Sequence, residues 1–296
     1  MVSGGVGRSR GEALKSRARR TLPKPAVILL RRVIDVCGGV IDELRWGRIR
    51  GEIAGAQLSG EGLVVVHIYY ADTWPDIAAK LLQCIPEAPV IVTTSGPVAS
   101  RDVKAVMPQA HVYRVPNRGR DVLPFLQVVR VLEGSNVEWF LKLHGKKSRH
   151  HRFGDEWMTS TLDALLPSAS VARACLDRLA EGVPLVGPRG FFYDLRTHLE
   201  PNRTRLEALT GSVDDKKLGF FGGTMWWIRR DSLTSLPRWR SWDFPKERGQ
   251  TDGTTAHIFE RLVCVAPQLA GSHLASVDGD GVRTMMSFDP FPYDKL

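Results

Sequence analysis

Runs of apolar, often β-branched residues alternate along the chain with segments whose apolar positions recur at helical spacing. Strand-length runs occupy residues 63–69, 89–94, 110–115 and 137–143, and glycine, proline or polar residues bound them. The segments between them, at 73–85, 98–107 and 122–132, have the character of helices. Strands that alternate with helices predict an α/β fold, with a Rossmann-type, mostly parallel sheet flanked by helices.

The second half of the chain continues this alternation with shorter elements. Helices are expected at 157–166, 171–179 and 251–263, and strands at 183–187 and 220–229. The pattern predicts one buried strand over 220–229, led by a glycine pair, and irregular chain over the last twenty residues. We therefore expect an N-terminal arm (1–60), a main domain (61–270) whose halves meet at about residue 150, and a C-terminal tail (271–296).

Polar side chains gather where each of the first four predicted strands ends. His67, Tyr69 and Tyr70 close the first strand, residues 93–96 the second, residues 117–121 the third and residues 144–148 the fourth. Parallel α/β sheets bind their ligands beyond the carboxyl ends of the strands. All four clusters therefore belong to one edge of the sheet, and we expect a binding site there.

The charge of the chain is unevenly distributed. Of its 296 residues 43% are hydrophobic and 25% charged, as in a globular protein, and the net charge is +9. Residues 1–50 hold 12 Lys or Arg against 4 Asp or Glu, whereas the rest holds 29 against 28. A DNA-binding globular domain normally carries its own basic face, so we expect no nucleic-acid partner.

The arm combines this basic charge with apolar residues. After an Arg-rich start, expected to be solvated and poorly ordered, apolar residues from 26 to 41 mix with Arg31, Arg32 and Asp35, and Trp46 follows. Residues 1–50 are either a basic amphipathic segment on anionic lipid headgroups or a disordered tail followed by a helix packed on the main domain. The apolar run is far short of the ~20 residues of a membrane span, and the start does not resemble a secretory signal. We expect a cytoplasmic protein, with peripheral attachment to the inner face of the cell membrane as an open alternative.

The cysteines offer no metal or disulfide pattern. They are scattered, with no CxxC pair and no metal-ligand spacing, at Cys37, Cys84, Cys175 and Cys264. We expect them to be small buried apolar residues in a reducing compartment.

The segment NRGRD at 117–121 stands where a helix is expected to begin. Backbone amides and the helix dipole favour an anion at such a position, and Arg118 and Arg120 add positive charge beside Asn117. Asp121 either caps the helix or binds a hydroxyl group of a ribose, base or sugar.

The segment LKLHGKKS at 141–148 is a stronger signal. Lys142 lies in an apolar strand, where a charge is costly unless it is paired. His144, Lys146 and Lys147 gather at the strand end beside Gly145, which allows the backbone to come close to a ligand. A diphosphate cradle is the favoured interpretation, and a solvated loop is the alternative for the later residues.

Two later segments carry aromatic and acidic groups. Gly222, Gly223 and Thr224 precede a pair of tryptophans, which suggests close backbone approach to a ligand, although tryptophan also fills cores. A carboxylate can act as a general base that takes a proton from a hydroxyl group. Spacing alone does not choose among Glu247, Asp252 and Glu260.

Taken together, these segments resemble the rhamnan synthesis protein F family of bacterial polysaccharide enzymes. The resemblance runs from about residue 63 to 263. It rests on HIYY (67–70), NRGRD (117–121), LKLHGKKS (141–148), FGGTMWW (221–227) and ERGQTDG (247–253), with Trp157, His257, Glu260 and Arg261. It implies a glycosyltransferase that moves a sugar, rhamnose first, from a nucleotide-sugar donor to a growing surface polysaccharide or lipid-linked glycan, as in cell-wall glycans or lipopolysaccharide O-antigens.

The resemblance also implies a GT-A-like fold with a donor-binding half (about 61–150) and an acceptor half (about 151–270). The residues expected at the donor are His67, Tyr69, Asn117, Arg118, Arg120, Asp121, Lys142, His144, Lys146 and Lys147. Those expected at the acceptor are Trp157, Gly222, Gly223, Thr224, Trp226 and His257.

The resemblance leaves the mechanism open at one point. Metal-dependent GT-A enzymes carry an Asp-x-Asp motif where this chain has Leu143, His144 and Gly145. Our hypothesis is that cationic side chains replace the metal, so we expect no metal and no cofactor, and dTDP-L-rhamnose as the favoured donor. By similarity to inverting enzymes, Asp252 is the first choice of catalytic base and Glu247 the second.

Two other functions stay open. The chain could be a non-catalytic glycan- or nucleotide-binding module, which binds without turnover. It could also be a sugar-phosphate transferase, because a phosphate cradle serves that reaction as well.

Overall fold

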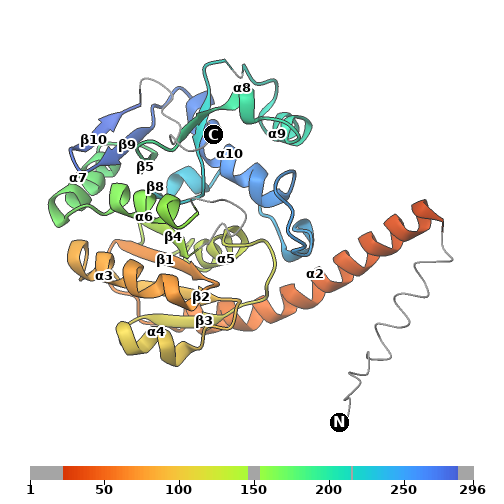
Figure 1. Ribbon diagram of the computed structural model, residues 1–296, viewed down its shortest axis with the longest axis horizontal. Helices are drawn as coiled ribbons and strands as arrows, with labels where there is room; N and C mark the ends of the chain where they lie inside the picture. Colours follow the sequence, from red (N-terminus) through yellow and green to blue (C-terminus); the bar gives the residue numbers. More distant parts are fainter. Residues whose placement is uncertain (1–22, 146–153, 215, 286–296) are drawn as a thin grey trace, which may run out of the picture.

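An eight-stranded sheet forms the centre of the protein (Figure 1), in the order β10-β9-β5-β8-β4-β1-β2-β3. The computed structural model describes residues 23–145, 154–214 and 216–285. The predictions made for residues 1–22, Lys146 and Lys147 lie outside these residues. The strands of the sheet are β1 (Gly62–Ile68), β2 (Val90–Thr94), β3 (His111–Arg114), β4 (Trp139–Gly145), β5 (Leu185–Pro188), β8 (Trp226–Arg229), β9 (Ala275–Asp278) and β10 (Gly281–Thr284).

The sheet is mostly parallel, as predicted. β3, β2, β1 and β4 are parallel neighbours. β8 runs antiparallel to both β4 and β5, β9 runs parallel to β5, and β10 runs antiparallel to β9. Six of the eight strands therefore point the same way, and the α/β fold class is confirmed.

Helices cover both faces of the sheet (Figure 1), because apolar residues of the inner strands alternate between two hydrophobic cores. Leu63 and Val65 of β1 face one core, and Val64 and Val66 face the other. The first core lies under α2 (Lys24–Ala54), α5 (Val122–Val131) and α10 (Thr255–Leu269). The second lies under α3 (Trp74–Cys84), α4 (Ser100–Val106), α6 (Gly154–Leu165) and α7 (Ala169–Ala180).

The segment 220–229 is two strands and not the single strand that its apolar run predicted. β7 (Gly219–Phe221) pairs with β6 (Phe192–Asp194) in a separate two-stranded sheet, and β8 belongs to the main sheet. Residues 222–225 turn the chain between them. Both Gly223 (φ 88°) and Thr224 (φ 55°) adopt left-handed backbone conformations, which end a strand.

Other boundaries also differ from the prediction. The C-terminal tail (271–296), whose last twenty residues were expected to be irregular, supplies β9 and β10 to the main sheet. α10 begins at Thr255 and not at 251, so Asp252 precedes the helix. The remaining elements are α8 (Leu195–His198), α9 (Arg203–Thr210) and the 3-10 turns η1 (Ala71–Thr73), η2 (Asp231–Leu233) and η3 (Ser241–Asp243).

The two halves of α2 have different surroundings. Trp46, Ile49 and Ile53 of its second half are buried in the first core, as the packed-helix interpretation predicts. Its first half projects from the body of the protein (Figure 1). Cys37 on this half is exposed, which contradicts the expected burial, whereas the other three cysteines are buried. Across the described residues every helix is too short or too polar to cross a membrane.

Candidate functional site at the carboxyl ends of the parallel strands

A cavity of about 300 Å³ opens where β1 and β4 end. It is lined by His67, Tyr69, Tyr70, Asn117, Arg120, Asp121, His144, Gly145, Glu247 and Gly249. Four segments that lie far apart in the sequence therefore meet in one place. The register of the sheet explains part of this, because His67 of β1 stands opposite both Thr93 of β2 and His144 of β4.

Lys142 and Asp121 form a buried ion pair beneath this cavity. Lys142 is 1% exposed, and its Nζ donates to the Asp121 carboxylate, to the Thr224 carbonyl oxygen at 2.8 Å and to the Thr224 hydroxyl at 3.1 Å. The Thr224 hydroxyl in turn donates to Asp121 at 2.5 Å. An ammonium has three hydrogens to donate, and all three are used. The expected direct contact of Lys142 with a diphosphate is therefore not what the structure shows.

This pair fixes the protonation of Asp121. Burial alone would raise the pKa of Asp121, but the charges of Lys142 and His144 and the hydrogen bonds from Lys142 and Thr224 hold it well below its ordinary value. Asp121 is thus an ionised, hydrogen-bonded carboxylate that lines the cavity. Its side chain does not cap α5 by a hydrogen bond, which was one of the two roles considered for it.

His67 and His144, which line the cavity, both form hydrogen bonds to neighbouring strands and turns. His67 contacts the Thr93 hydroxyl through Nδ1 at 2.9 Å and the Ser95 hydroxyl through Nε2 at 3.2 Å. Burial lowers the pKa of His67 to about 4, so the ring is neutral at neutral pH. His144 donates from Nε2 to the Gly223 carbonyl oxygen at 2.5 Å, because a carbonyl can only accept.

Arg120 joins the third-strand loop to the loop before α10. Its Nε donates to Glu247 at 3.3 Å, its Nη1 contacts His257 Nε2 at 3.0 Å, and its Nη2 donates to the Gln250 carbonyl oxygen. Its backbone has φ 55°, which a side chain other than glycine rarely adopts. Arg120 therefore lines the cavity as expected, and it also holds Glu247 at the cavity wall.

Arg118 has a structural contact instead of the donor contact predicted for it. It is 4% exposed and does not belong to the cavity lining. Its Nε donates to Asp42 of α2 at 2.8 Å, and its Nη1 donates to the Phe244 carbonyl oxygen at 2.7 Å. The guanidinium thus anchors α2 to the body of the protein.

The structure separates the two candidate bases. Glu247 lines the cavity, but Asp252 does not belong to the described lining. Asp252 accepts hydrogen bonds from the Asn202 amide at 2.8 Å, from the Gly253 backbone at 2.7 Å and from Arg261 at 3.1 Å. Its oxygens hold the start of α10 in place, which favours Glu247 over Asp252 for the chemistry.

The third candidate, Glu260, is also engaged elsewhere. It accepts from the Gly223 backbone N–H at 2.6 Å and contacts Arg261 at 3.4 Å. Glu260 therefore stabilises the turn at 222–225 through its hydrogen bond with Gly223.

The residues expected to face an acceptor pack behind the cavity. Trp226, which was expected to contact a sugar, is instead fully buried against Phe125, with ring centroids 5.4 Å apart, and does not belong to the cavity lining. A Cβ built on Gly223 would overlap the indole ring of Trp157, and one on Gly222 would crowd Tyr193. Close packing of rings, and not a ligand, therefore explains why both positions are glycine.

The other acceptor-side residues are likewise internal. Thr224 is buried under the cavity, where it contacts Lys142 and Asp121. His257 is 9% exposed and contacts Arg120. Gly145 does line the cavity, but a Cβ there would overlap the Thr73 hydroxyl, so packing alone accounts for its small size.

Three lining residues had not been assigned to the donor, the acceptor or catalysis: Tyr70, Gly145 and Gly249. Each lies inside a segment that the resemblance had already marked, and Tyr70 and Gly145 also belong to the clusters expected at the binding edge of the sheet. Tyr70 follows Tyr69 directly, and the two rings meet edge to face with centroids 5.0 Å apart.

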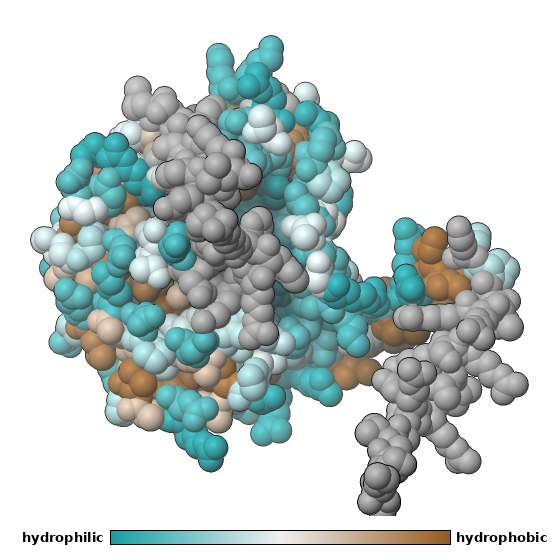
Figure 2. Space-filling view, in the orientation of Figure 1, coloured by the Kyte–Doolittle hydropathy of each residue, from teal (hydrophilic) through white to brown (hydrophobic). Residues whose placement is uncertain are grey.

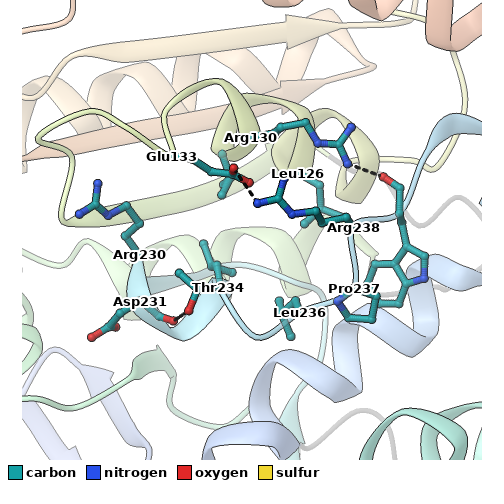
Figure 3. A pocket seen from close by; sticks show the side chains of 12 residues that line it. Leu126, Arg130, Glu133, Arg230, Asp231, Thr234, Leu236, Pro237 and Arg238 are labelled. Carbon is teal, nitrogen blue, oxygen red and sulfur yellow. Dashed lines mark hydrogen bonds and ion pairs between the residues drawn. The ribbon is translucent and has the colours of Figure 1, made fainter.

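A second hollow of about 360 Å³ lies near the amino end of β4, between α5 and residues 230–239 (Figure 3). Its arginines are occupied by their neighbours: Arg238 pairs with Glu133 at 3.0 Å, and Arg130 donates to the Trp239 carbonyl oxygen at 2.9 Å. It contains none of the motif residues. Within the described part of the chain, no group of three His, Cys, Asp or Glu side chains is placed to hold a metal ion.

Known structures resemble this chain only loosely. A 4-diphosphocytidyl-2C-methyl-D-erythritol synthase superposes with a TM-score of 0.40 and 10% identity, over 76% of this chain and 91% of that one. Glucosyl-3-phosphoglycerate synthase of Mycobacterium tuberculosis, in complex with Mn²⁺, uridine diphosphate and glucosyl-3-phosphoglycerate, gives 0.38 and 18%, over 83% and 78%. Likeness at this level bears on neither substrate nor chemistry.

Sequence comparison is more informative. The uncharacterized protein WxcX of Xanthomonas campestris pv. campestris is 31% identical over 255 residues, which cover 82% of this chain and 36% of that protein. The chain thus spans about a third of the length of the curated relatives it matches. Residues 55–187 match the family model of rhamnan synthesis protein F, and this segment contains three of the four groups of cavity residues. The resemblance predicted from the motifs is therefore confirmed over residues 55–187, which are similar to the rhamnan synthesis protein F family.

Proposed function

We propose that this protein is a glycosyltransferase that transfers a sugar from a nucleotide-sugar donor, with dTDP-L-rhamnose favoured, to a growing surface polysaccharide or lipid-linked glycan. The observation that carries the proposal is the cavity, where four separate segments place polar side chains and a carboxylate at the ligand-binding edge of the sheet. The similarity of residues 55–187 to rhamnan synthesis protein F supports sugar transfer as the chemistry.

Backbone strain at the cavity supports a functional role. Among the described residues other than glycine, positive φ occurs at Arg120 and Thr224. Arg120 contacts the carboxylate of Glu247, and Thr224 contacts that of Asp121. Such conformations cost on the order of 1–3 kcal/mol and persist where the surroundings impose them, often at active sites.

The lining residues suggest a division of roles. The half-exposed ring of Tyr69 offers a stacking surface for the base or sugar of the donor. Among the described residues that line the cavity, Arg120 has a permanently charged basic side chain. It would stabilise the charge of the leaving diphosphate. In the sequence Lys146 and Lys147 follow Gly145 directly, so we propose that they add the charge that a metal ion supplies in other transferases.

We assign the role of general base to Glu247. A base must be able to take up a proton near the working pH, and Asp121, the other carboxylate of the lining, is held ionised by Lys142. Glu247 would take the proton of the acceptor hydroxyl as its oxygen attacks the anomeric carbon and the bond to the diphosphate breaks. A diphosphate that binds Arg120 would compete with Glu247 for the guanidinium, and Glu247 would then be free to act as the base.

The first experiment measures donor binding and transfer by the purified full chain. Nucleotide sugars, dTDP-L-rhamnose first, are tested by thermal shift with and without EDTA, and products are then identified with a glycan acceptor. We expect a shift that EDTA does not change, worth about 2 kcal/mol or more at saturating donor. Glu247→Gln should retain the shift and lose transfer by at least about a hundredfold, whereas the matched variant Asp252→Asn should retain both.

Each contrary result has a distinct meaning. A shift abolished by EDTA would overturn metal independence. Binding without turnover in the unmodified protein would identify a binding module, and phosphate on the acceptor product would identify a sugar-phosphate transferase. Loss of transfer in Asp252→Asn alone would return the base to Asp252.

A further inference from the structure

Residues 28–44 of α2 include a row of exposed large aliphatic side chains. Ile28, Leu29, Leu30, Val33, Ile34, Val36, Val40, Ile41 and Leu44 are between 44% and 74% exposed. Figure 2 shows hydrophobic surface along this projecting helix, at the right of the molecule. Single exposed aliphatic residues are ordinary, but a contiguous group of this kind marks an interaction surface.

Between residues 35 and 43, polar side chains of the helix face the protein. Asp35 pairs with Arg248 at 2.7 Å, Asp42 with Arg118 at 2.8 Å, and Glu43 accepts from the Ser241 hydroxyl at 2.8 Å. Leu29, Val33, Val36, Val40 and Leu44 follow one another at helical spacing and share the outward side. A surface helix of a globular protein normally has the opposite orientation, with its apolar stripe on the core.

The acidic and basic residues between positions 31 and 45 of α2 differ in their contacts. The three acidic residues are the ones that pair with the body, so they are unavailable on the outward side. Arg31, Arg32 and Arg45 are exposed. Residues 1–22, which precede the helix, contain six Lys or Arg and one Glu in the sequence.

We infer that the outward face of α2 binds an anionic membrane surface, with the aliphatic row in the headgroup–acyl boundary and the basic residues on lipid headgroups. Residues 28–44 span ~25 Å at ~1.5 Å per residue, enough to lie along the bilayer plane. The helix is too polar to cross the bilayer. This inference uses no cavity residue and stands apart from the proposed function.

The membrane position would bring the cavity close to the lipid surface. The anchors of α2 are Arg118, which adjoins the lining residue Asn117, and Arg248, which stands between the lining residues Glu247 and Gly249. A helix seated on the bilayer therefore holds these loops beside the membrane, where a lipid-linked acceptor would be.

The test is sedimentation of the full chain with vesicles of phosphatidylcholine, alone or mixed with phosphatidylglycerol. We expect binding to the mixed vesicles, and a decrease of at least about tenfold in the triple variant Val33→Asn, Val40→Asn, Leu44→Asn. The matched control is Leu82→Asn, Val106→Asn, Leu209→Asn, which alters three aliphatic residues of 39–44% exposure elsewhere on the protein and should bind as the unchanged protein does.

Three results would overturn the inference. The protein could fail to bind anionic vesicles. The α2 variant could also bind them as well as the control variant does, which would mean that basic residues alone, such as those in 1–22, are responsible for binding. Light scattering could also show a dimer that the α2 variant converts to monomer, which would assign the face to a second copy of this chain. None of these readouts requires a sugar donor, so their failure is distinguishable from failure of the proposed transferase activity.

Discussion

At the scale of single residues, the Lys142–Asp121 pair determines what the cavity floor can do. A buried charge is tolerated when its partner and further hydrogen bonds are present, and Lys142 has Asp121 and Thr224 around it. Removing the ammonium would leave the Asp121 carboxylate buried and unpaired.

We therefore predict that Lys142→Ala lowers the free energy of unfolding by ~3–5 kcal/mol. Urea denaturation followed by circular dichroism measures this, with Lys104→Ala on the exposed side of α4 as the control, which should change little. If Lys142→Ala were as stable as the unchanged protein and had lost donor binding, Lys142 would instead serve the ligand directly.

His67 gives the stability of the protein a dependence on pH. Burial lowers its pKa from 6.5 in the unfolded chain to about 4 in the folded protein. The unfolded state therefore binds the proton first as the pH falls, so this contribution to stability is complete above pH 6.5 and is lost as the pH falls toward about 4.

Between pH 6.5 and about pH 5 the loss attributable to His67 should be roughly 1.5 kcal/mol. It is measured as the difference in unfolding free energy at the two pH values between the unchanged protein and His67→Gln. The same substitution at the partly exposed His111 should leave the pH dependence as it is. A pH dependence identical in all three proteins would show that His67 is not held neutral by burial.

Residue identity predicted which segments meet at the cavity better than it predicted the contacts of single side chains. Asp252 was chosen from an acidic motif, but nothing near it in the sequence shows that Asn202 and Arg261 occupy its oxygens. Lys142 was correctly expected to need a partner, and only the fold shows that the partner is Asp121 and not a phosphate.

At the scale of elements, the turn at 222–225 shows what a hydrophobic pattern misses. The run from Phe220 to Ile228 contains no charged residue and only one polar one, Thr224, which predicts one strand, yet positive φ values at Gly223 and Thr224 divide it. The turn brings the Gly223 carbonyl oxygen to His144 and the Thr224 carbonyl oxygen to Lys142, so it braces two residues of β4.

Gly223→Ala should disturb this brace. The new Cβ would overlap the indole ring of Trp157 and would sit on a left-handed backbone, so we expect a loss of at least ~2 kcal/mol in unfolding free energy and weaker donor binding. Thermal unfolding measures the first effect. Gly211→Ala also places a side chain on a backbone with positive φ (80°) but without a clash, because no atom lies within 4 Å of its Cβ position, and should cost less. Equal losses in both would remove packing against Trp157 as the cause.

At the scale of the whole molecule, the place of the site was predictable because strand ends in a parallel sheet share one edge. That rule alone brought residues near 67, 117 and 144 together, and the register then set His67 opposite His144. The segment at 247–249 could be placed only by resemblance, since it joins the site from a loop before α10. The strands β9 and β10 were missed because each is four residues long and their run includes charged residues.

The outward face of α2 has a consequence for the stability of the whole molecule. The residues that join α2 to the body, including Asp35, Asp42 and Trp46, all follow residue 34. A chain that begins at residue 34 should therefore unfold within ~0.5 kcal/mol of the complete chain in urea, while it binds vesicles more weakly because it lacks four members of the aliphatic row, Ile28, Leu29, Leu30 and Val33. Trp46→Ala in the complete chain should instead cost ~3–5 kcal/mol, because it opens a cavity in the first core. A large loss of stability on removing residues 1–33 would mean that the first half of α2 packs against the protein in solution, and the membrane face would then be buried.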